Sequence, residues 1–372
     1  MAKPVRIGLI GCGSVVVKYM KLAEQLHFRG MAEVVLACDV DASKKQFMRD
    51  KFGVERFTTS YQEVIERDDI DLVLVLTSML EHGPITKAAL QAGKHVLVEK
   101  PLAATLEEAA ELIEIAENAQ GILMPAPHII LSKTYQAIWR RVHRGEIGDV
   151  KLARALYGWA GPWWGQWFYR PGGGALFDMG VYNVTSLTGF LGPVKRVMAM
   201  TGVAIPERVV EGELMKVQAE DNAHVLLDFG ESVFAVVTTG YTIQKYRCPA
   251  IELYGTRGTI QMMGDDWDPE GYELWLNSVG AWQVHGEPEP AWPWVDGLRH
   301  LVKCIQTGAR PIITPAHGYH VLEIMLKAQE SGRDGQAKLI QSTFAPPAFP
   351  DEPIGGGPSD AAHLVHDPTD GL

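Results

Sequence analysis

The chain has 372 residues, of which 47% are hydrophobic and 21% charged, and its formal net charge is −11. This composition is typical of a soluble globular protein that is long enough for two domains with cores of their own. The acidic balance argues against a nucleic-acid partner, and the longest apolar runs, such as residues 72–76, are too short to span a membrane. The four cysteines are scattered, and a strand expected at Val5 leaves no room for a signal peptide, so we expect buried thiols in the cytoplasm.

The first predicted elements are a strand, a glycine turn and a helix. Residues 5–10 form an apolar run, Gly11 and Gly13 follow it, and a helix is expected from about Val17 to Leu26. Gly11 permits a tight turn, and Gly13 lets the backbone approach a dinucleotide pyrophosphate at the helix N-terminus. Val16 stands where the fingerprint has a third small residue, so an ordinary strand–helix turn remains an alternative. The cofactor contacts expected here are Gly11, Gly13, Ser14 and Val15.

An aspartate ends the next predicted strand, residues 33–38. Asp39 lies 26 positions after Gly13, near the spacing expected for an acid that binds the ribose hydroxyls of the dinucleotide. Its carboxylate would repel a 2′-phosphate and no basic residue directly follows it, which favours NAD over NADP. The alternative is that Asp39 or Asp41 caps the helix expected over residues 43–52.

Strands and helices continue to alternate as far as residue 124. Repeated strand–helix units at this spacing predict an α/β fold with a doubly wound parallel sheet, a Rossmann domain, over residues 1–125. The expected helices cover residues 60–66 and 84–91, and the expected strands cover residues 72–76, 95–98 and 122–124.

Glu99-Lys100-Pro101 ends the strand over residues 95–98. Because proline disfavours helix in the residue before it, Lys100 should be extended at the carboxyl end of the strand, where open α/β sheets bind ligands. A helix is then expected from Thr105 to Ala119, with Thr105 and Glu108 spaced as a capping box. Lys100 is either a structural cation paired with Glu99 or a proton-transfer group.

Residues 126–343 are expected to form a second, α+β domain. Apolar and polar residues alternate in several runs between residues 194 and 263, which predicts an open, mostly antiparallel sheet. His317 and His320 are one helical turn apart, but no third ligand is evident, so we assign no metal. Residues 344–372, rich in proline and glycine, are expected to be a tail. The other expected elements are helices over residues 131–144, 294–306 and 318–331 and a strand over residues 150–157.

Two segments of the second domain carry candidate site residues. Residues 159–169 hold four tryptophans, one phenylalanine and one tyrosine and fit neither strand nor helix. Such an aromatic loop either walls a sugar pocket or covers a small satellite core. Glycines at 172–174 then lead into a helix expected over residues 175–189, where Asp178 and Tyr182 share one face at i, i+4. Asp178 could equally be a helix-cap residue.

These motifs, in this order, resemble those of the Gfo/Idh/MocA oxidoreductases, which include glucose–fructose oxidoreductase and inositol dehydrogenase. The resemblance covers about residues 5–340 and is most specific at residues 92–101, Ala-Gly-Lys-His-Val followed by Glu-Lys-Pro. It implies that Lys100 lies beside the nicotinamide and the hydroxyl being oxidised. Tyr182, four residues after Asp178, resembles a tyrosine-type subfamily, whereas Ser78 departs from the Thr-Pro-Asn that is usual there.

The resemblance also assigns the remaining site residues. His128 is an expected substrate contact, although a core or rim histidine explains it equally well. The implied cofactor contacts are Thr77, Ser78, His82, Glu99 and Lys100. The implied substrate contacts are His128, Trp164, Trp167, Arg170, Asp178 and Tyr182.

The sequence therefore predicts an NAD-dependent oxidoreductase that transfers hydride between the nicotinamide and a secondary hydroxyl of a sugar, sugar derivative or cyclic polyol. Lys100 would take the alcohol proton or donate to the alkoxide, and Asp178 would orient a substrate hydroxyl. Tyr182, with its pKa lowered by Lys100, is the alternative proton carrier. Other hypotheses are an NAD-retaining, redox-assisted glycoside-cleaving enzyme and a non-enzymatic NAD or sugar sensor. The open sheet predicts a homo-dimer or homo-tetramer.

Overall fold

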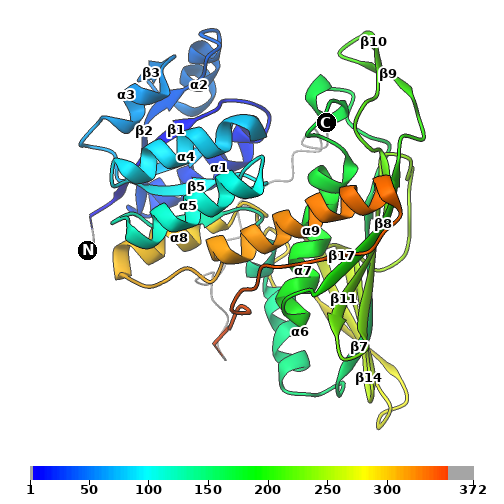
Figure 1. Cartoon of the computed structure of the whole chain (residues 1–372). Coiled ribbons are helices and arrows are strands. Elements are labelled where there is room, and N and C mark those ends of the chain that lie inside the picture. The colour runs from blue at the N-terminus through cyan, green and yellow to red at the C-terminus, as the bar shows by residue number, and fades with distance from the viewer. Residues whose placement is uncertain (1–2, 351–372) are drawn as a thin grey trace.

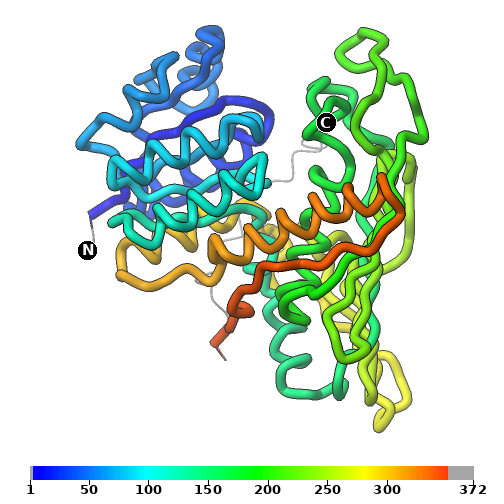
Figure 2. Tube along the Cα trace, viewed as in Figure 1, coloured from blue at the N-terminus to red at the C-terminus, as the bar shows by residue number. Residues whose placement is uncertain are grey.

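The computed structural model describes residues 3–350, and its first half is built on a six-stranded parallel sheet (Figures 1 and 2). The strand order is β3-β2-β1-β4-β5-β6, that of a doubly wound dinucleotide-binding sheet, so the predicted Rossmann architecture is confirmed. The strands are β1 (Val5–Ile10), β2 (Ala32–Cys38), β3 (Phe57–Thr58), β4 (Leu72–Val75), β5 (His95–Val98) and β6 (Leu123–Pro125). The helices are α1 (Val16–Phe28), α2 (Lys44–Phe52), α3 (Tyr61–Ile65), α4 (His82–Gln91), α5 (Leu106–Asn118) and the 3₁₀ turn η1 (Met79–Glu81).

The central strands of this sheet end at the same level. β4 is buried at every residue, as expected for a parallel strand covered on both faces. The register pairs Ile10 with Val75 and Val75 with Val98. The residues that follow β1, β4 and β5 therefore emerge side by side at the switch point of the sheet, where ligands bind in such folds.

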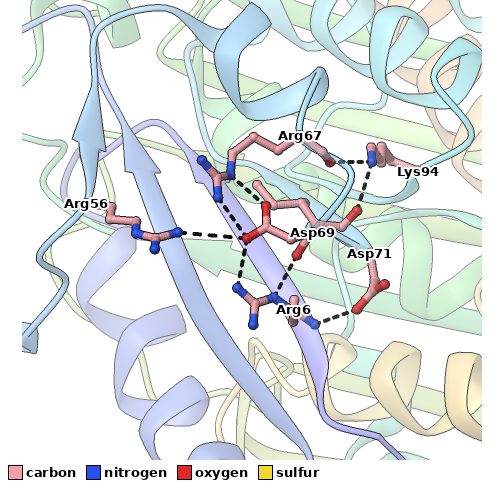
Figure 3. Close-up of polar contacts among 7 residues, drawn as sticks. Arg6, Arg56, Arg67, Asp69, Asp71 and Lys94 are labelled. Atoms are coloured by element: carbon pink, nitrogen blue, oxygen red, sulfur yellow. Dashed lines mark hydrogen bonds and ion pairs between the residues drawn. The ribbon is translucent and has the colours of Figure 1, made fainter.

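A polar network closes the opposite, amino ends of these strands (Figure 3). Asp69, just before β4, accepts hydrogen bonds from Arg67 at 2.7 and 2.8 Å and from Arg6 at 2.9 Å. Arg67 and then Arg6 lower the pKa of the Asp69 carboxyl to about 2. Lys94, just before β5, donates to the backbone carbonyls of Arg67 and Ile70. This network stabilises the end of the sheet that faces away from the candidate site.

The second half contains a nine-stranded sheet with the order β16-β15-β14-β13-β7-β12-β11-β8-β17. β7 and β12 are parallel and the other neighbours are antiparallel, so the predicted open, mostly antiparallel sheet is confirmed. The strands are β7 (Val150–Gly158), β8 (Arg196–Gly202), β11 (Asn222–Gly230), β12 (Val233–Gly240), β13 (Ile251–Gly255), β14 (Gly258–Asp265), β15 (Asp268–Leu276), β16 (Trp282–Gly286) and β17 (Lys338–Leu339). A separate hairpin is formed by β9 (Glu207–Val210) and β10 (Glu213–Lys216).

Helices cover one face of the nine-stranded sheet (Figure 1). α6 (Lys133–His143), α7 (Val181–Leu191) and α9 (Pro315–Asp334) lie on this face, and α9 also packs against α5 and β6 of the first sheet. α8 (Gly297–Thr307), which falls in the predicted second domain, packs against α1, β1 and β5. The opposite face carries an exposed group of apolar side chains, here called the uncovered apolar face: Leu152, Met198, Met200, Leu226 and Phe234.

Several boundaries differ from the sequence expectations. The Thr105 side chain caps α5 by accepting the Glu108 N–H at 3.2 Å, but the Glu108 carboxylate returns to the Ala104 N–H, one residue before the position a capping box requires. The start of the expected tail is packed: Phe344 stacks on His317 at 4.2 Å between ring centroids, and Phe349 is buried. Residues 351–372 of the expected tail lie outside the described residues.

Candidate active site

The candidate site centres on an ion pair between the two halves of the chain. Lys100 follows β5, and its Nζ lies 2.7 Å from the Asp178 carbonyl oxygen and 3.1 Å from Asp178 Oδ1. The two side chains are 13% and 18% exposed, so both remain within reach of a ligand. The peptide bond from Lys100 to Pro101 is cis.

A π-helical turn presents Asp178. The expected continuous helix over residues 175–189 is instead a π turn, Leu176–Gly180, followed by α7. Single π turns within helices are frequent at functional sites. Tyr182, the other residue predicted on this helix, still lies near Lys100: the Lys100 Nζ is 5.4 Å from the centroid of the Tyr182 ring.

The Glu99 carboxylate is held by groups other than the Lys100 ammonium. Its Oε1 accepts the hydroxyl of Tyr19, from α1, at 2.8 Å, and its Oε2 accepts the backbone N–H of Lys100 at 3.0 Å. The sequence left a structural cation paired with Glu99 as one alternative for Lys100, and the structure instead places the Lys100 ammonium against Asp178. Tyr19, which sequence reasoning missed, links the helix of the glycine turn to the strand end that carries Lys100.

Burial governs the ionisation of Tyr182. Burial, followed by the Glu99 carboxylate and by Tyr157, raises the pKa of Tyr182 well above its usual value of 10. This is opposite to the lowering by Lys100 that the sequence suggested. Tyr182 thus keeps its proton at neutral pH, which leaves its hydroxyl able to donate a hydrogen bond to a ligand. Tyr157, at the end of β7, lies 6.0 Å from Tyr182 between ring centroids, and burial raises its pKa as well.

A second tyrosine holds the other oxygen of Asp178. Tyr241 is completely buried and donates its hydroxyl to Asp178 Oδ2 at 3.0 Å. Sequence reasoning missed it, although it directly follows the carboxyl end of β12, which is parallel to β7. With Lys100 on Oδ1 and Tyr241 on Oδ2, the plane of the carboxylate is fixed.

The glycine turn has the geometry that a dinucleotide requires. Gly11 has a φ of 99°, and a Cβ there would lie 2.6 Å from the Leu76 carbonyl, so only glycine fits. Gly13 and Ser14 are exposed, and nothing lies within 4 Å of a Cβ on Gly13. Val15 is half-buried at the start of α1, and Val16 is buried in the core instead of a third small residue.

Asp39 lies at the carboxyl end of β2, beside this turn. Its Oδ2 accepts the Cys12 N–H at 2.7 Å, and its Oδ1 accepts the Asp41 N–H at 2.9 Å. Asp41 accepts the Ser43 N–H at 2.9 Å, which supports the turn before α2. The N-cap position of α2 is Ser43, so neither aspartate takes the capping role that the sequence allowed, and Asp39 is oriented toward the glycine turn.

The residues after β4 complete this edge of the sheet. The Thr77 Oγ1 is buried and has no hydrogen-bond partner among residues 3–350, and Ser78 is exposed. His82 is buried, and its ring nitrogens lie 2.7 Å from the Pro101 carbonyl and 3.1 Å from the Thr77 carbonyl. Burial lowers the pKa of His82. The His82 ring therefore connects the loops that follow β4 and β5 through hydrogen bonds to both.

The aromatic loop is partly packed in the satellite core that the sequence allowed, and the rest of it is exposed. Tyr169 is buried in a satellite core with Tyr241, whereas Trp163 and Trp167 are 60% and 43% exposed. Trp164 is half-buried, and Arg170 is exposed and donates to Gln166. The glycine segment that follows the loop lies beside the first half of the chain, since a Cβ on Gly172 would lie 3.6 Å from Met79 Sδ.

His128 lies in the interior. It has no exposed surface, and its ring packs against Gly297 of α8. Neither ring nitrogen has a hydrogen-bond partner in the part of the chain that the structure describes. Burial lowers the pKa of His128 to about 3, so the ring is neutral. This position favours a core histidine over a substrate contact.

His317 and His320 both have structural partners. His317 Nε2 lies 2.8 Å from Thr188 Oγ1, and His320 Nε2 accepts the Val194 N–H at 2.9 Å. Within residues 3–350, no group of three metal-binding side chains is found. No helix in the same range is both long and apolar enough to cross a membrane.

Comparison with known proteins identifies the fold and its family. Residues 5–126 match a family described as "Oxidoreductase family, NAD-binding Rossmann fold", and residues 135–261 match the "GFO/IDH/MocA C-terminal domain". The chain belongs to the Gfo/Idh/MocA oxidoreductase family. As a Gfo/Idh/MocA protein it is an NAD-binding oxidoreductase.

Individual relatives of this Gfo/Idh/MocA protein act on sugars. It is 31% identical, over 70% of its own length and 75% of the relative's, to dTDP-3,4-didehydro-2,6-dideoxy-alpha-D-glucose 3-reductase from Saccharopolyspora spinosa. It is 28% identical, over 91% of its own length and 99% of the relative's, to 1,5-anhydro-D-fructose reductase from Ensifer adhaerens. Levoglucosan dehydrogenase in complex with NADH and levoglucosan has the same fold, with a TM-score of 0.81, 21% identity and coverage of 91% and 99%.

The residues of this edge fit the NAD of the Gfo/Idh/MocA family. The exposed backbone at Gly13 and the N-terminus of α1 suit a pyrophosphate, and Asp39 suits the ribose hydroxyls. The unpartnered Thr77 Oγ1 is a further polar group at this edge. The cofactor supplies the acceptor or donor of a hydride, and the chain must supply the groups that orient the substrate and handle its proton.

Proposed function

We propose that the protein is an NAD-dependent dehydrogenase or reductase that interconverts a secondary hydroxyl and a carbonyl on a sugar, sugar derivative or cyclic polyol. The observation that carries this proposal is the meeting of Lys100, Asp178 and Tyr182 at the carboxyl end of β5. The carbohydrate oxidoreductases among the relatives support the substrate class.

Lys100 is the proposed proton-handling group. An ammonium has three N–H donors, and two of them are directed at Asp178 within the described chain, which leaves one for a substrate oxygen. When a carbonyl is reduced, the ammonium can donate to the alkoxide that forms and give it this proton, which leaves a neutral amine; when an alcohol is oxidised, the neutral amine takes the hydroxyl proton as the hydride leaves. Tyr182 keeps its own proton and donates to the same oxygen, and Asp178 accepts a neighbouring substrate hydroxyl.

Two matched variants test these roles. Lys100→Met keeps the length of the stem and removes the charge, so turnover should fall ~10²–10⁴-fold, the usual contribution of a general acid–base group, while NAD binding stays intact. Tyr182→Phe removes only a hydroxyl and should cost less. A larger loss in Tyr182→Phe would make the tyrosine the proton carrier, and less than tenfold loss in both folded variants would contradict the site.

The same assay separates the rival functions. A sugar and polyol panel, followed at the absorbance of reduced nicotinamide, should show net NAD reduction for a dehydrogenase. Glycoside cleavage without net reduction would support the NAD-retaining alternative, and binding without any chemistry would support a sensor.

Three further proposals concern NAD choice, assembly and location. Asp39, held at the end of β2, supports a preference for NAD over NADP. The uncovered apolar face supports a homo-dimer or homo-tetramer, because apolar side chains gathered on an exposed sheet face mark an interaction surface. All four cysteines are free thiols, and location in the cytoplasm stays a prediction.

A further inference from the structure

The contacts around Asp178 extend well beyond Lys100. Tyr241 has no exposed surface, and burial, followed by the Asp178 charge, raises its pKa well above 10, so its hydroxyl keeps its proton and acts as a donor. The bond to Asp178 Oδ2 at 3.0 Å joins residues 63 positions apart in the chain. Tyr241 therefore restrains the oxygen that Lys100 does not.

Tyr241 is in turn held by an arginine from the β9–β10 hairpin. Arg208 donates to the backbone carbonyl of Tyr241 at 2.8 Å and to that of Ala160, in the aromatic loop, at 2.7 Å. Its guanidinium lies 5.3 Å from the centroid of the Tyr169 ring. The Arg208 side chain thus hydrogen-bonds both Tyr241, which holds Asp178, and the aromatic loop, which carries the tryptophans.

Arg208 is itself fixed by a buried carboxylate. Asp221 is fully buried, lies 3.4 Å from Arg208 and also accepts the backbone N–H groups of Ala204 at 2.6 Å and Ile205 at 3.1 Å. The guanidinium side chain is 12% exposed. Because the carboxylate that contacts the guanidinium is itself fixed by two backbone N–H groups, the arginine is held in one position.

We propose that Tyr241 and Arg208 are positioning residues for the reaction: Tyr241 fixes the plane of the Asp178 carboxylate, and Arg208 anchors Tyr241 and the aromatic loop together. The inference rests on the proposed function, because it assumes that Asp178 orients a substrate hydroxyl. Without Tyr241 only Lys100 restrains the Asp178 carboxylate, which can then turn about its Cβ–Cγ bond. A misplaced acceptor lowers the rate of the bound complex more than it lowers binding.

Tyr241→Phe tests this directly, with Tyr169→Phe as the matched control. Both remove a buried hydroxyl from the same aromatic pair, but the Tyr169 hydroxyl bonds the Pro162 carbonyl at 2.7 Å instead of Asp178. On the best sugar of the panel, Tyr241→Phe should lower kcat by about 10- to 100-fold with NAD affinity unchanged. Tyr169→Phe should lower kcat much less than Tyr241→Phe does, because the Tyr169 hydroxyl does not hold Asp178.

A double-variant experiment tests the anchor. Arg208→Lys keeps the charge but loses the fork of donors, so it should lower kcat and raise KM. If Arg208 acts through Tyr241, the variant with both changes should lose little more kcat than the worse single variant. The inference would be overturned if the kcat loss of the double variant equalled the product of the two single losses. It would also be overturned if Tyr241→Phe and Tyr169→Phe lowered kcat equally. An unmodified protein that turns over no sugar would instead overturn the proposed function.

Discussion

Replacing Asp266 by asparagine should make the protein more stable above neutral pH. Asp266 lies in the turn between β14 and β15, is 2% exposed, and accepts hydrogen bonds from Asn183 at 2.9 Å and Ser186 at 3.3 Å, both on α7. Burial, assisted by the neighbouring Asp265, raises the pKa of Asp266 to about 7. Asparagine keeps the acceptor for α7 and removes the charge.

The size of the effect follows from the difference between the folded and unfolded pKa values. An unfolded aspartate has a pKa of about 3.9, so the folded chain holds the Asp266 proton more tightly, and the difference corresponds to about 4 kcal/mol. This stabilisation is fully present below pH ~3.9 and is lost as the pH rises through about 7. The variant should therefore match the unmodified protein near pH 4 and exceed its free energy of unfolding at pH 8.

Denaturant unfolding at a series of pH values measures this difference. Asp268→Asn, at an exposed position in the same hairpin, is the control: burial and the neighbouring Asp265 raise the pKa of Asp268 as well, so its change with pH should have the same direction but be smaller. The reasoning is refuted if Asp266→Asn is less stable than the unmodified protein at pH 8, or if their difference does not change between pH 4 and pH 8.

The remaining predictions concern the cofactor, the assembly and the amino ends of the first sheet. Asp39→Ser should narrow the preference for NAD over NADP, chiefly through weaker NAD binding; equal affinity of the unmodified protein for both cofactors would contradict this role. Light scattering at micromolar concentration should give a multiple of the 40.9 kDa chain mass, and Leu226→Lys on the uncovered apolar face should reduce it, whereas a monomeric unmodified protein would refute the interface. Because the pKa of Asp69 is lowered, its stabilising effect is present above pH ~3.9 and lost as the pH falls toward 2. Asp69→Asn should therefore lower the melting temperature at pH 7 but not near pH 2, with kcat unchanged. If the variant and the unmodified protein melted at the same temperature at pH 7, the ion pairs of Asp69 would contribute little to stability.

Local sequence patterns predicted the parts of the site that depend on a strand end or a helix face. The apolar run that ends in Glu99-Lys100-Pro101 placed Lys100 at the carboxyl end of β5, and the i, i+4 spacing brought Asp178 and Tyr182 to one side. The π turn was not predictable, because it adds a residue to one turn without changing the apolar pattern.

The residues that sequence reasoning missed act through long-range packing. Tyr19 and Glu99 are 80 positions apart, and Tyr241 and Asp178 are 63 apart, so no local spacing indicates either bond. The ionisation of Tyr182 also depends on burial by distant segments, which reversed the expected direction of its pKa change. Only the packed structure distinguishes a buried His128 from a pocket histidine.

Hydride transfer from a sugar is the central claim, and isotope transfer tests it most directly. The sugar or polyol that the panel identifies would be prepared with deuterium on the carbinol carbon and incubated with NAD and the unmodified protein. Deuterium should appear on the nicotinamide ring of the reduced cofactor, and the transfer should be nearly lost in Lys100→Met. Reduced cofactor without deuterium, or no transfer to the nicotinamide from any sugar or polyol, would contradict the proposed chemistry.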